Sequence, residues 1–170
     1  MKAALLKGLN QFEIETIEKP IPKEHEVLVK IKAAGICGSD IHKMQNEWKY
    51  ELPMVMGHEF SGVIESIGSK VKRILIGDRV VVAPLIPCHE CVYCESGKYQ
   101  LCEDYTMIGS HRYGGFEEYV TVPEENVINI GESISFEEAA MIEPLAVAAH
   151  GVMGLDPKIG DTVAVFGLGT

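Results

Sequence analysis

The alternation of apolar and polar positions dominates the first 130 residues of this chain, where short apolar runs are separated by glycine and proline. Alternating runs and short β-branched runs are both typical of β-strands. We predict strands at residues 3–6, 12–16, 27–34, 54–67, 79–82, 116–122 and 127–130. Gly57, Gly62 and Gly68 accompany the fourth run and predict bends or bulges there. The fold class expected from this pattern is mainly β with short helices.

The pattern changes at residue 135. Residues 135–138 have the form of a capping box, which begins a helix. Pro144 should disturb this helix because proline has no backbone N–H and restricts the residue before it. Residues 145–150 then resume an apolar helical run.

The last residues read as the beginning of a second unit. Residues 158–161 predict a turn, and residues 162–166 form an apolar run of the kind found in buried strands. Gly167 and Gly169 follow, and such a pair opens the phosphate-binding turn of dinucleotide-binding βαβ units. The two glycines alone could simply end a strand. Their place after an apolar strand strengthens the cofactor-binding interpretation, but without a family resemblance the end of a strand is the interpretation that we prefer.

Composition excludes several classes of protein. Of 170 residues, 46% are hydrophobic and 24% charged, which is typical of a globular chain. The net charge of −10 is spread along the chain without a basic stripe, so nucleic-acid binding is not expected. No apolar run approaches the roughly 20 residues of a membrane span, and the N-terminus does not resemble a signal peptide. We expect a cytoplasmic protein whose clustered cysteines bind metal.

Four of the five cysteines follow one another closely, with the spacing C-x2-C-x2-C-x7-C: Cys88, Cys91, Cys94 and Cys102. Short spacings let one loop supply all four thiolates of a closed tetrahedral Zn²⁺ site. Two disulfides would be the alternative in a secreted domain, but nothing in the sequence indicates secretion. Residues 87–107 have no strand pattern and are too polar to hold together without metal, so we predict a structural zinc there.

The fifth cysteine, Cys37, stands apart and predicts a different kind of site. His58, Glu59 and Glu143 also lie at the ends of predicted elements, where side chains can converge on a cleft. A catalytic Zn²⁺ needs three protein ligands and an open position for water or substrate. A lone cysteine is usually buried and inert, so the combination of residues carries this hypothesis.

Six ordered segments make the chain resemble a known family: residues 35–40 (GICGSD), 57–62 (GHEFSG), 77–80 (GDRV), the four-cysteine loop, 114–119 (GGFEEY) and 142–145 (IEPL). The chain resembles the zinc-containing medium-chain alcohol and polyol dehydrogenases on these motifs. Glu143 stands where simple alcohol dehydrogenases have cysteine, which is similar to the sorbitol dehydrogenase branch. Residues 84–88 and 108–110 are most similar to galactitol-1-phosphate 5-dehydrogenases.

This resemblance implies a particular arrangement of metal and proton-transfer residues. Cys37, His58 and Glu59 would hold a catalytic zinc, with Glu143 as a fourth ligand or a close neighbour. The four clustered cysteines would hold the structural zinc, which makes two Zn²⁺ per chain.

The short segment after Cys37 carries the implied proton transfer. Ser39 would accept the proton of the substrate hydroxyl, and His42 would be the outer end of the proton relay. Asp40 would orient the zinc-binding histidine. The resemblance thus implies Ser39, His42 and Glu143 as catalytic residues.

The resemblance also implies a domain plan and a reaction. A GroES-like β-barrel catalytic domain would occupy residues 1–150, with the structural-zinc lobe at 87–107, and residues 151–170 would begin a truncated Rossmann domain. The full-length parent, expected to be a homo-oligomer, would oxidise a secondary hydroxyl of a polyol or sugar alcohol, with or without a phosphate, using NAD or NADP. The alternative is a non-catalytic zinc-stapled β-barrel scaffold.

Substrate contacts are less defined by the sequence. Trp48 and Tyr50 could line the cleft or simply cover the core. His111 and Arg112 could reach a polyol hydroxyl or a phosphate, although a surface arginine is the interpretation that we favour.

Overall fold

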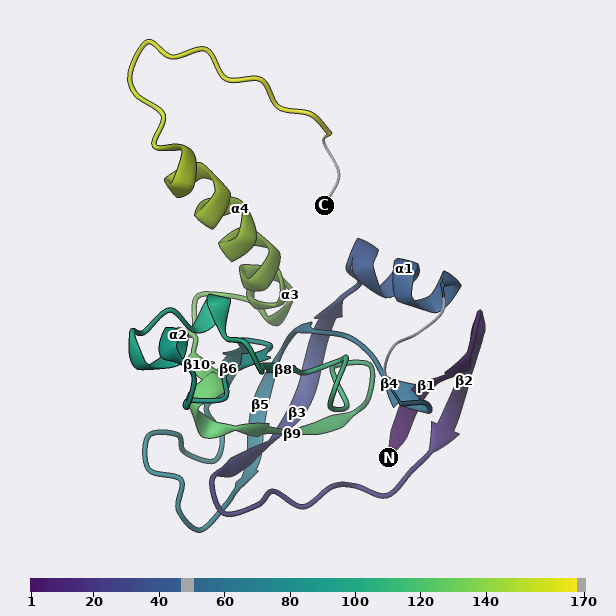
Figure 1. Cartoon of the computed structure of the whole chain (residues 1–170). Helices are drawn as coiled ribbons and strands as arrows, with labels where there is room; N and C mark the ends of the chain where they lie inside the picture. The colour runs from purple at the N-terminus through teal and green to yellow at the C-terminus, as the bar shows by residue number, and fades with distance from the viewer. Residues whose placement is uncertain (47–50, 168–170) are drawn as a thin grey trace.

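The computed structural model describes residues 1–46 and 51–167. Its central five-stranded antiparallel sheet has the order β10 (Val127–Asn129), β6 (Arg79–Val82), β5 (Glu59–Ile67), β3 (Glu26–Gly35) and β9 (Tyr119–Pro123). Beside it lies a three-stranded sheet in the order β2 (Gln11–Thr16), β1 (Lys2–Gly8) and β4 (Met54–Val55). Figure 1 shows the two sheets side by side, with α1 (Gly38–Gln45), α3 (Phe136–Ala140) and α4 (Ile142–Leu155) at one end. The predicted mainly β fold class is confirmed.

The alternating runs form the core because every second side chain points to the same face of its strand. Three pairs of valines two residues apart are buried from β3, β6 and β9: Val27 and Val29, Val80 and Val82, Val120 and Val122. Phe60 and Ile64 of β5 pack among them. Full burial of such a side chain contributes about 1.5–3 kcal/mol, so this cluster anchors the central sheet.

The strand predicted at residues 54–67 is divided into β4 and β5 at Gly57, which has a φ of 91°. A β-carbon on Gly57 would lie 2.6 Å from the ring of Phe116. A β-carbon on Gly114 would lie 2.1 Å from the carbonyl oxygen of Gly57. Only glycine allows this backbone contact, which ties the start of β5 to the segment that precedes β9. The bend predicted at Gly57 is confirmed.

Helix α1 (Gly38–Gln45) was not predicted, because its sequence has no apolar periodicity. It begins at a capping box in which Cys37 is the N-cap and Asp40 is the third helical residue. Between β7 (Leu85–Ile86) and β8 (Thr106–Met107), the excursion from the sheets contains the short helices α2 (Val92–Glu95) and η1 (Tyr99–Leu101). A further short helix, η2 (Glu124–Asn126), links β9 to β10.

Two helices follow the sheets, α3 (Phe136–Ala140) and α4 (Ile142–Leu155). The predicted capping box is confirmed: the Glu138 N–H donates to Ser135 Oγ at 3.1 Å, and the Ser135 N–H donates to the Glu138 carboxylate at 2.8 Å. The break falls at Met141 instead of at Pro144. Pro144 lies in the first turn of α4, where its missing N–H leaves no hydrogen bond unmade.

The segment after α4 forms the predicted turn at residues 158–161, where the Asp161 N–H donates to the Lys158 carbonyl at 3.1 Å. The strand predicted at 162–166 is wrong for this structure, since these residues are extended, exposed and unpaired within the described chain. A strand needs a hydrogen-bonded neighbour, and this segment lies apart from both sheets, beyond α4 (Figure 1). Gly167 has a φ of 89°, and Gly169 lies outside the described residues.

Candidate metal centres

The excursion between β7 and β8 brings the four clustered cysteines together. One ligand atom from each lies within 4.8 Å of all the others: Cys88, Cys91, Cys94 and Cys102. All are free thiols, and the backbone N–H of Cys88 donates to the Cys102 sulfur at 3.2 Å. A set of four sulfur atoms at this separation has the composition of a closed zinc site.

Two thiols of this cluster have pKa values shifted in opposite directions. Hydrogen bonds from the backbone of Glu103 and then of Cys94 lower the pKa of Cys91 to about 6. Burial raises the pKa of Cys94 to about 12. Without metal one thiol of the cluster therefore ionises easily while another is held neutral. A divalent cation would stabilise all four as thiolates, because metal binding displaces the protons.

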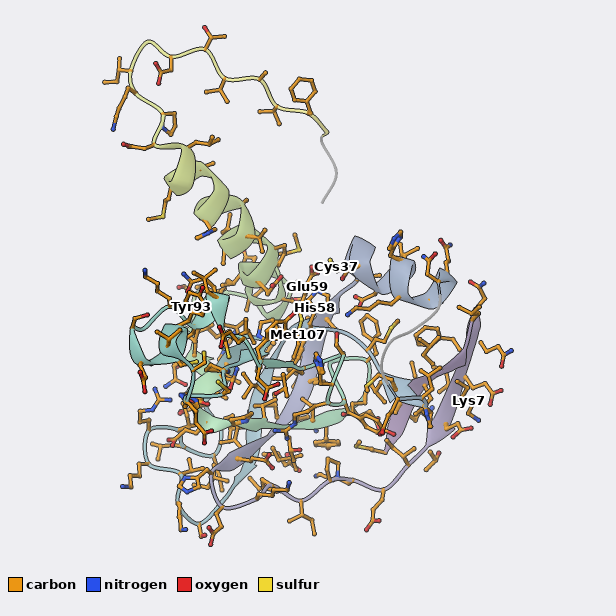
Figure 2. All side chains as sticks on the ribbon, in the orientation of Figure 1. Lys7, Cys37, His58, Glu59, Tyr93 and Met107 are labelled. Atoms are coloured by element: carbon orange, nitrogen blue, oxygen red, sulfur yellow. The ribbon has the colours of Figure 1, made fainter. Side chains whose placement is uncertain are left out.

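The second group consists of Cys37, His58 and Glu59, whose ligand atoms also lie within 4.8 Å of one another. Figure 2 shows their labelled side chains gathered beside the start of α1. The antiparallel register places Gly35 at the end of β3 opposite Glu59 at the start of β5. A β-carbon on Gly35 would lie 2.3 Å from a Glu59 carboxylate oxygen, so a side chain here would displace that carboxylate.

Asp40 connects two members of this group. Its carboxylate is 2% exposed, accepts a hydrogen bond from the Cys37 backbone N–H at 3.1 Å, and lies 3.5 Å from Nδ1 of His58. This carboxylate is the main cause of the raised pKa of His58. A carboxylate beside one ring nitrogen of a histidine orients the ring and makes the other nitrogen a better ligand.

Glu143 lies near this group but outside it. It is the second residue of α4, and burial raises its pKa, opposed by the charge of His58 and assisted by that of Glu59. It also lines a groove of about 550 Å³ together with Tyr105, Met107 and His150. Its carboxyl group is therefore placed as a near neighbour of the three candidate ligands.

Of the other predicted site residues, Ser39 and His42 lie on α1 beside the site, whereas Arg112 and His111 contact residues that belong to neither metal centre. Ser39 and His42 are exposed and three residues apart on α1, which puts them on the same side of the helix. Arg112 donates to the Glu26 carboxylate at 2.7 Å and belongs to an ion pair. Nδ1 of His111 accepts the Met107 N–H at 3.0 Å. Trp48 and Tyr50 lie outside the described residues.

Lys43 is a feature of the site that sequence reasoning missed. Its ammonium donates to Ser110 Oγ at 2.6 Å, and burial lowers its pKa while the charges of Asp40 and Cys37 raise it. Lys43 was overlooked because α1 was not predicted. The available signal was the spacing of Cys37 and Asp40, three residues apart as in a capping box. Their residue types differ from the usual Ser or Thr followed by Glu or Gln.

The family model described as alcohol dehydrogenase GroES-like domain matches residues 23–132 of the chain. The chain belongs to this family. The match spans both candidate metal centres except Glu143. It confirms the resemblance inferred from the motifs and the expected GroES-like fold.

Curated relatives of this GroES-like chain include polyol dehydrogenases. It is 41% identical over 173 residues to the protein named probable D-xylulose reductase A of Emericella nidulans, covering 97% of the chain and 48% of that protein. It is 38% identical over 174 residues to sorbitol dehydrogenase of Bacillus subtilis, with coverages of 99% and 49%. The chain thus spans about half the length of the curated relatives that it matches.

Solved structures share the fold of the GroES-like chain. A short-chain alcohol dehydrogenase (RspB) of Escherichia coli CFT073, complexed with NADH, superposes with a TM-score of 0.88 and 41% identity over 95% of this chain and 48% of that chain. Galactitol-1-phosphate dehydrogenase of Escherichia coli superposes with a TM-score of 0.86 and 37% identity, over 92% of this chain and 45% of that chain. A cobalt- and zinc-bound alcohol dehydrogenase of Pyrobaculum aerophilum superposes with a TM-score of 0.77 and 33% identity, over 84% of this chain and 44% of that chain.

Proposed function

We propose that this chain is the zinc-binding catalytic part of an NAD(P)-dependent dehydrogenase that oxidises a secondary hydroxyl of a polyol or sugar alcohol. The observation that carries the proposal is the grouping of Cys37, His58 and Glu59 within 4.8 Å, separate from the four-cysteine cluster. One sulfur, one nitrogen and one oxygen ligand with an open position fit a catalytic Zn²⁺. The names of the relatives support the substrate class.

The residues of the chain would divide the work at this centre. Zinc held there would act as a Lewis acid on the substrate hydroxyl and lower its pKa. Asp40, 3.5 Å from Nδ1 of His58, would orient the imidazole for ligation. Ser39 would accept the hydroxyl proton and His42 would pass it to solvent, since both lie on the exposed side of α1. Glu143 would be a fourth ligand or a neighbouring charge.

The four-cysteine cluster would hold a structural zinc that orders residues 87–107. Its four sulfur atoms leave no open position for substrate. Binding of zinc at comparable small sites is worth about 10–16 kcal/mol at neutral pH, enough to fold a lobe with little apolar core of its own.

We further propose a division into residues 1–150, the catalytic domain, and residues 151–170, the beginning of a nucleotide-binding domain. In such a protein the second domain would cover α4 and residues 162–166, and Gly167 and Gly169 would contact NAD or NADP. The substrate could carry a phosphate. A homo-oligomer and a cytosolic location stay predictions. In the described part of the chain, no helix has the length and apolar character that crossing a membrane requires.

Zinc analysis tests this proposal. The wild-type chain should contain about two zinc ions, and Cys37→Ser should contain about one while keeping the fold. A scaffold with an empty Cys37 site would contain one zinc ion in both proteins. The full-length enzyme should oxidise members of a panel of polyols and polyol phosphates, and the Cys37→Ser enzyme should not. Two bound zinc ions without any such activity would support both metal sites and refute the proposal that the protein is a dehydrogenase.

A further inference from the structure

The carboxyl group of Glu117 is buried without a hydrogen-bond donor at one of its oxygens. Glu117 is 8% exposed, and Oε2 has no hydrogen-bond partner. The residue lies on the segment that joins the two sheets, where it pairs with Ala3 in an isolated bridge. Buried polar atoms without partners are rare in proteins and need an explanation. None of the roles proposed above uses Glu117.

Glu117 lines a cavity of about 250 Å³ between the N-terminus, the segment after β2 and the strand β9. The apolar part of the wall includes Ile17, Pro20 and Val120. No lining residue belongs to either candidate metal centre. Cavities of about 150 Å³ already admit small organic molecules, so this one has room for a ligand with a short apolar body.

The charged groups around the cavity decide which polar group fits. Met1 and Arg112 bring positive charge, and Glu18 and Glu117 bring negative charge. The Arg112 guanidinium is already neutralised by the Glu26 carboxylate 2.7 Å away. The Met1 ammonium already donates to a backbone carbonyl at 2.8 Å. With Arg112 paired to Glu26, ionised Glu117 and Glu18 leave two negative charges beside the single positive charge of Met1, and this excess favours a cationic ligand.

We propose that this cavity binds a small primary alkylammonium ion, which donates hydrogen bonds to the Glu117 carboxylate while its alkyl chain contacts Ile17, Pro20 and Val120. Hydrogen bonds between an ammonium and a carboxylate are stronger than those between neutral groups. Transfer of the alkyl chain from water to the apolar wall adds a second favourable term. An alcohol of the same shape would keep the apolar contacts of the alkyl chain and lose the hydrogen bonds between ammonium and carboxylate.

Binding of the ammonium ion should release a proton. Burial raises the pKa of Glu117 to about 8, so its carboxyl group is mostly protonated at neutral pH and must ionise to pair with the ligand. Affinity should therefore rise between about pH 6 and pH 8. The Met1 amine, Glu18, Arg112 and Tyr113 face the same cavity. A Glu117→Gln variant keeps all four and isolates the contribution of Glu117.

Isothermal titration of the zinc-loaded chain with butylammonium chloride tests the proposal. Titrations at neutral pH in two buffers of different ionisation enthalpy give the number of protons released, which should be close to one. Glu117→Gln should bind about tenfold or more weakly, and should release no proton. Glu137→Gln is the control, because Glu137 is exposed and lies outside the lining of the cavity, so this variant should bind like the wild type. The uncharged analogue 1-butanol should bind far more weakly than butylammonium.

Absence of butylammonium binding to the wild type would overturn the proposal, as would equal binding by Glu117→Gln or binding without proton release. The wild-type proton count decides the matter even if Glu117→Gln fails to fold. Neither readout depends on oxidation of an alcohol. A negative result here therefore leaves the dehydrogenase proposal unaffected, and a failed dehydrogenase leaves this site open to test.

Discussion

At the residue scale, the most informative side chain is Asp40, whose carboxylate contacts a backbone N–H and lies beside an imidazole. One oxygen accepts the Cys37 N–H, and the other faces His58. The same carboxylate therefore caps α1 and orients an imidazole. A change at Asp40 should affect metal binding first, because the helix retains its other backbone hydrogen bonds.

We predict that Asp40→Asn weakens zinc binding at the Cys37 centre by about 10–100-fold, because the imidazole loses the carboxylate that orients and polarises it. Competition with a chromophoric chelator measures the affinity of this centre. The structural zinc should be unaffected. Asp78→Asn is the control, since the Asp78 carboxylate accepts the Leu75 N–H at 2.8 Å and belongs to neither candidate metal centre. Equal losses in both variants would contradict the role of Asp40.

Glu117 should make the stability of the chain depend on pH. Its pKa is raised from 4.5 to about 8 in the folded state, so between these values the folded chain holds a proton that the unfolded chain has lost. The free energy of unfolding should fall by about 1.4 kcal/mol for each pH unit in this window as pH rises. Glu117→Gln should lack this slope and be more stable than the wild type at pH 8. Urea unfolding at several pH values measures both curves, and parallel curves would contradict the prediction.

At the element scale, the strands of the two larger sheets could be predicted from sequence, whereas α1 and the two-residue strands β7 and β8 were not predicted. Valines two residues apart mark β3, β6 and β9, because this spacing places both side chains on the face that is buried. The spacing can be seen in the sequence without any knowledge of the packed structure. Helix α1 depends on contacts of Asp40 with residues distant in sequence, and its own apolar pattern is weak. The segment 162–166 has the right pattern for a strand but no neighbour to pair with in the described chain.

The candidate sites divide in the same way. The spacing of four cysteines is a local signal and predicts their cluster directly. The meeting of Cys37 with His58 and Glu59 depends on the β3–β5 register, so it was inferred from a family resemblance. Lys43 and Glu117 were missed because burial and orphaned polar atoms are properties of the packed structure.

The structural lobe should behave as a separate cooperative unit. We predict that removal of zinc by a chelator, or the variant Cys91→Ser, exposes the amides of residues 87–107 to rapid hydrogen exchange, while β3 and β5 stay protected. The sheet keeps its own apolar cluster, whereas the lobe is held by its thiols. Exchange mass spectrometry reads both regions at once. A lobe that stays protected without metal would contradict the prediction.

At the scale of the whole molecule, the apolar surface is unevenly distributed. Helix α4 has no buried residue, and its Leu145 and Met153 are 65% and 79% exposed. Phe166 is 96% exposed beyond it. These exposed apolar side chains are the ones that the second domain proposed above would cover.

We predict that the purified 170-residue chain binds zinc but does not reduce NAD or NADP with any polyol. The described residues bring together the candidate ligands Cys37, His58 and Glu59, whereas the nucleotide-binding domain proposed above begins only at residue 151. Absorbance of the reduced cofactor across a polyol panel measures this, with the full-length enzyme as the positive control. Robust turnover by the chain alone would show that the proposed division of labour is wrong.

The contact between Gly57 and Gly114 limits how this scaffold can be redesigned. A saturation library should show both positions intolerant of every side chain, although neither glycine carries a ligand atom. Loop grafts between the two points would have to preserve their spacing to keep His58 in place. An engineer who wants a new substrate should therefore vary the groove around Glu143 and leave these two glycines untouched.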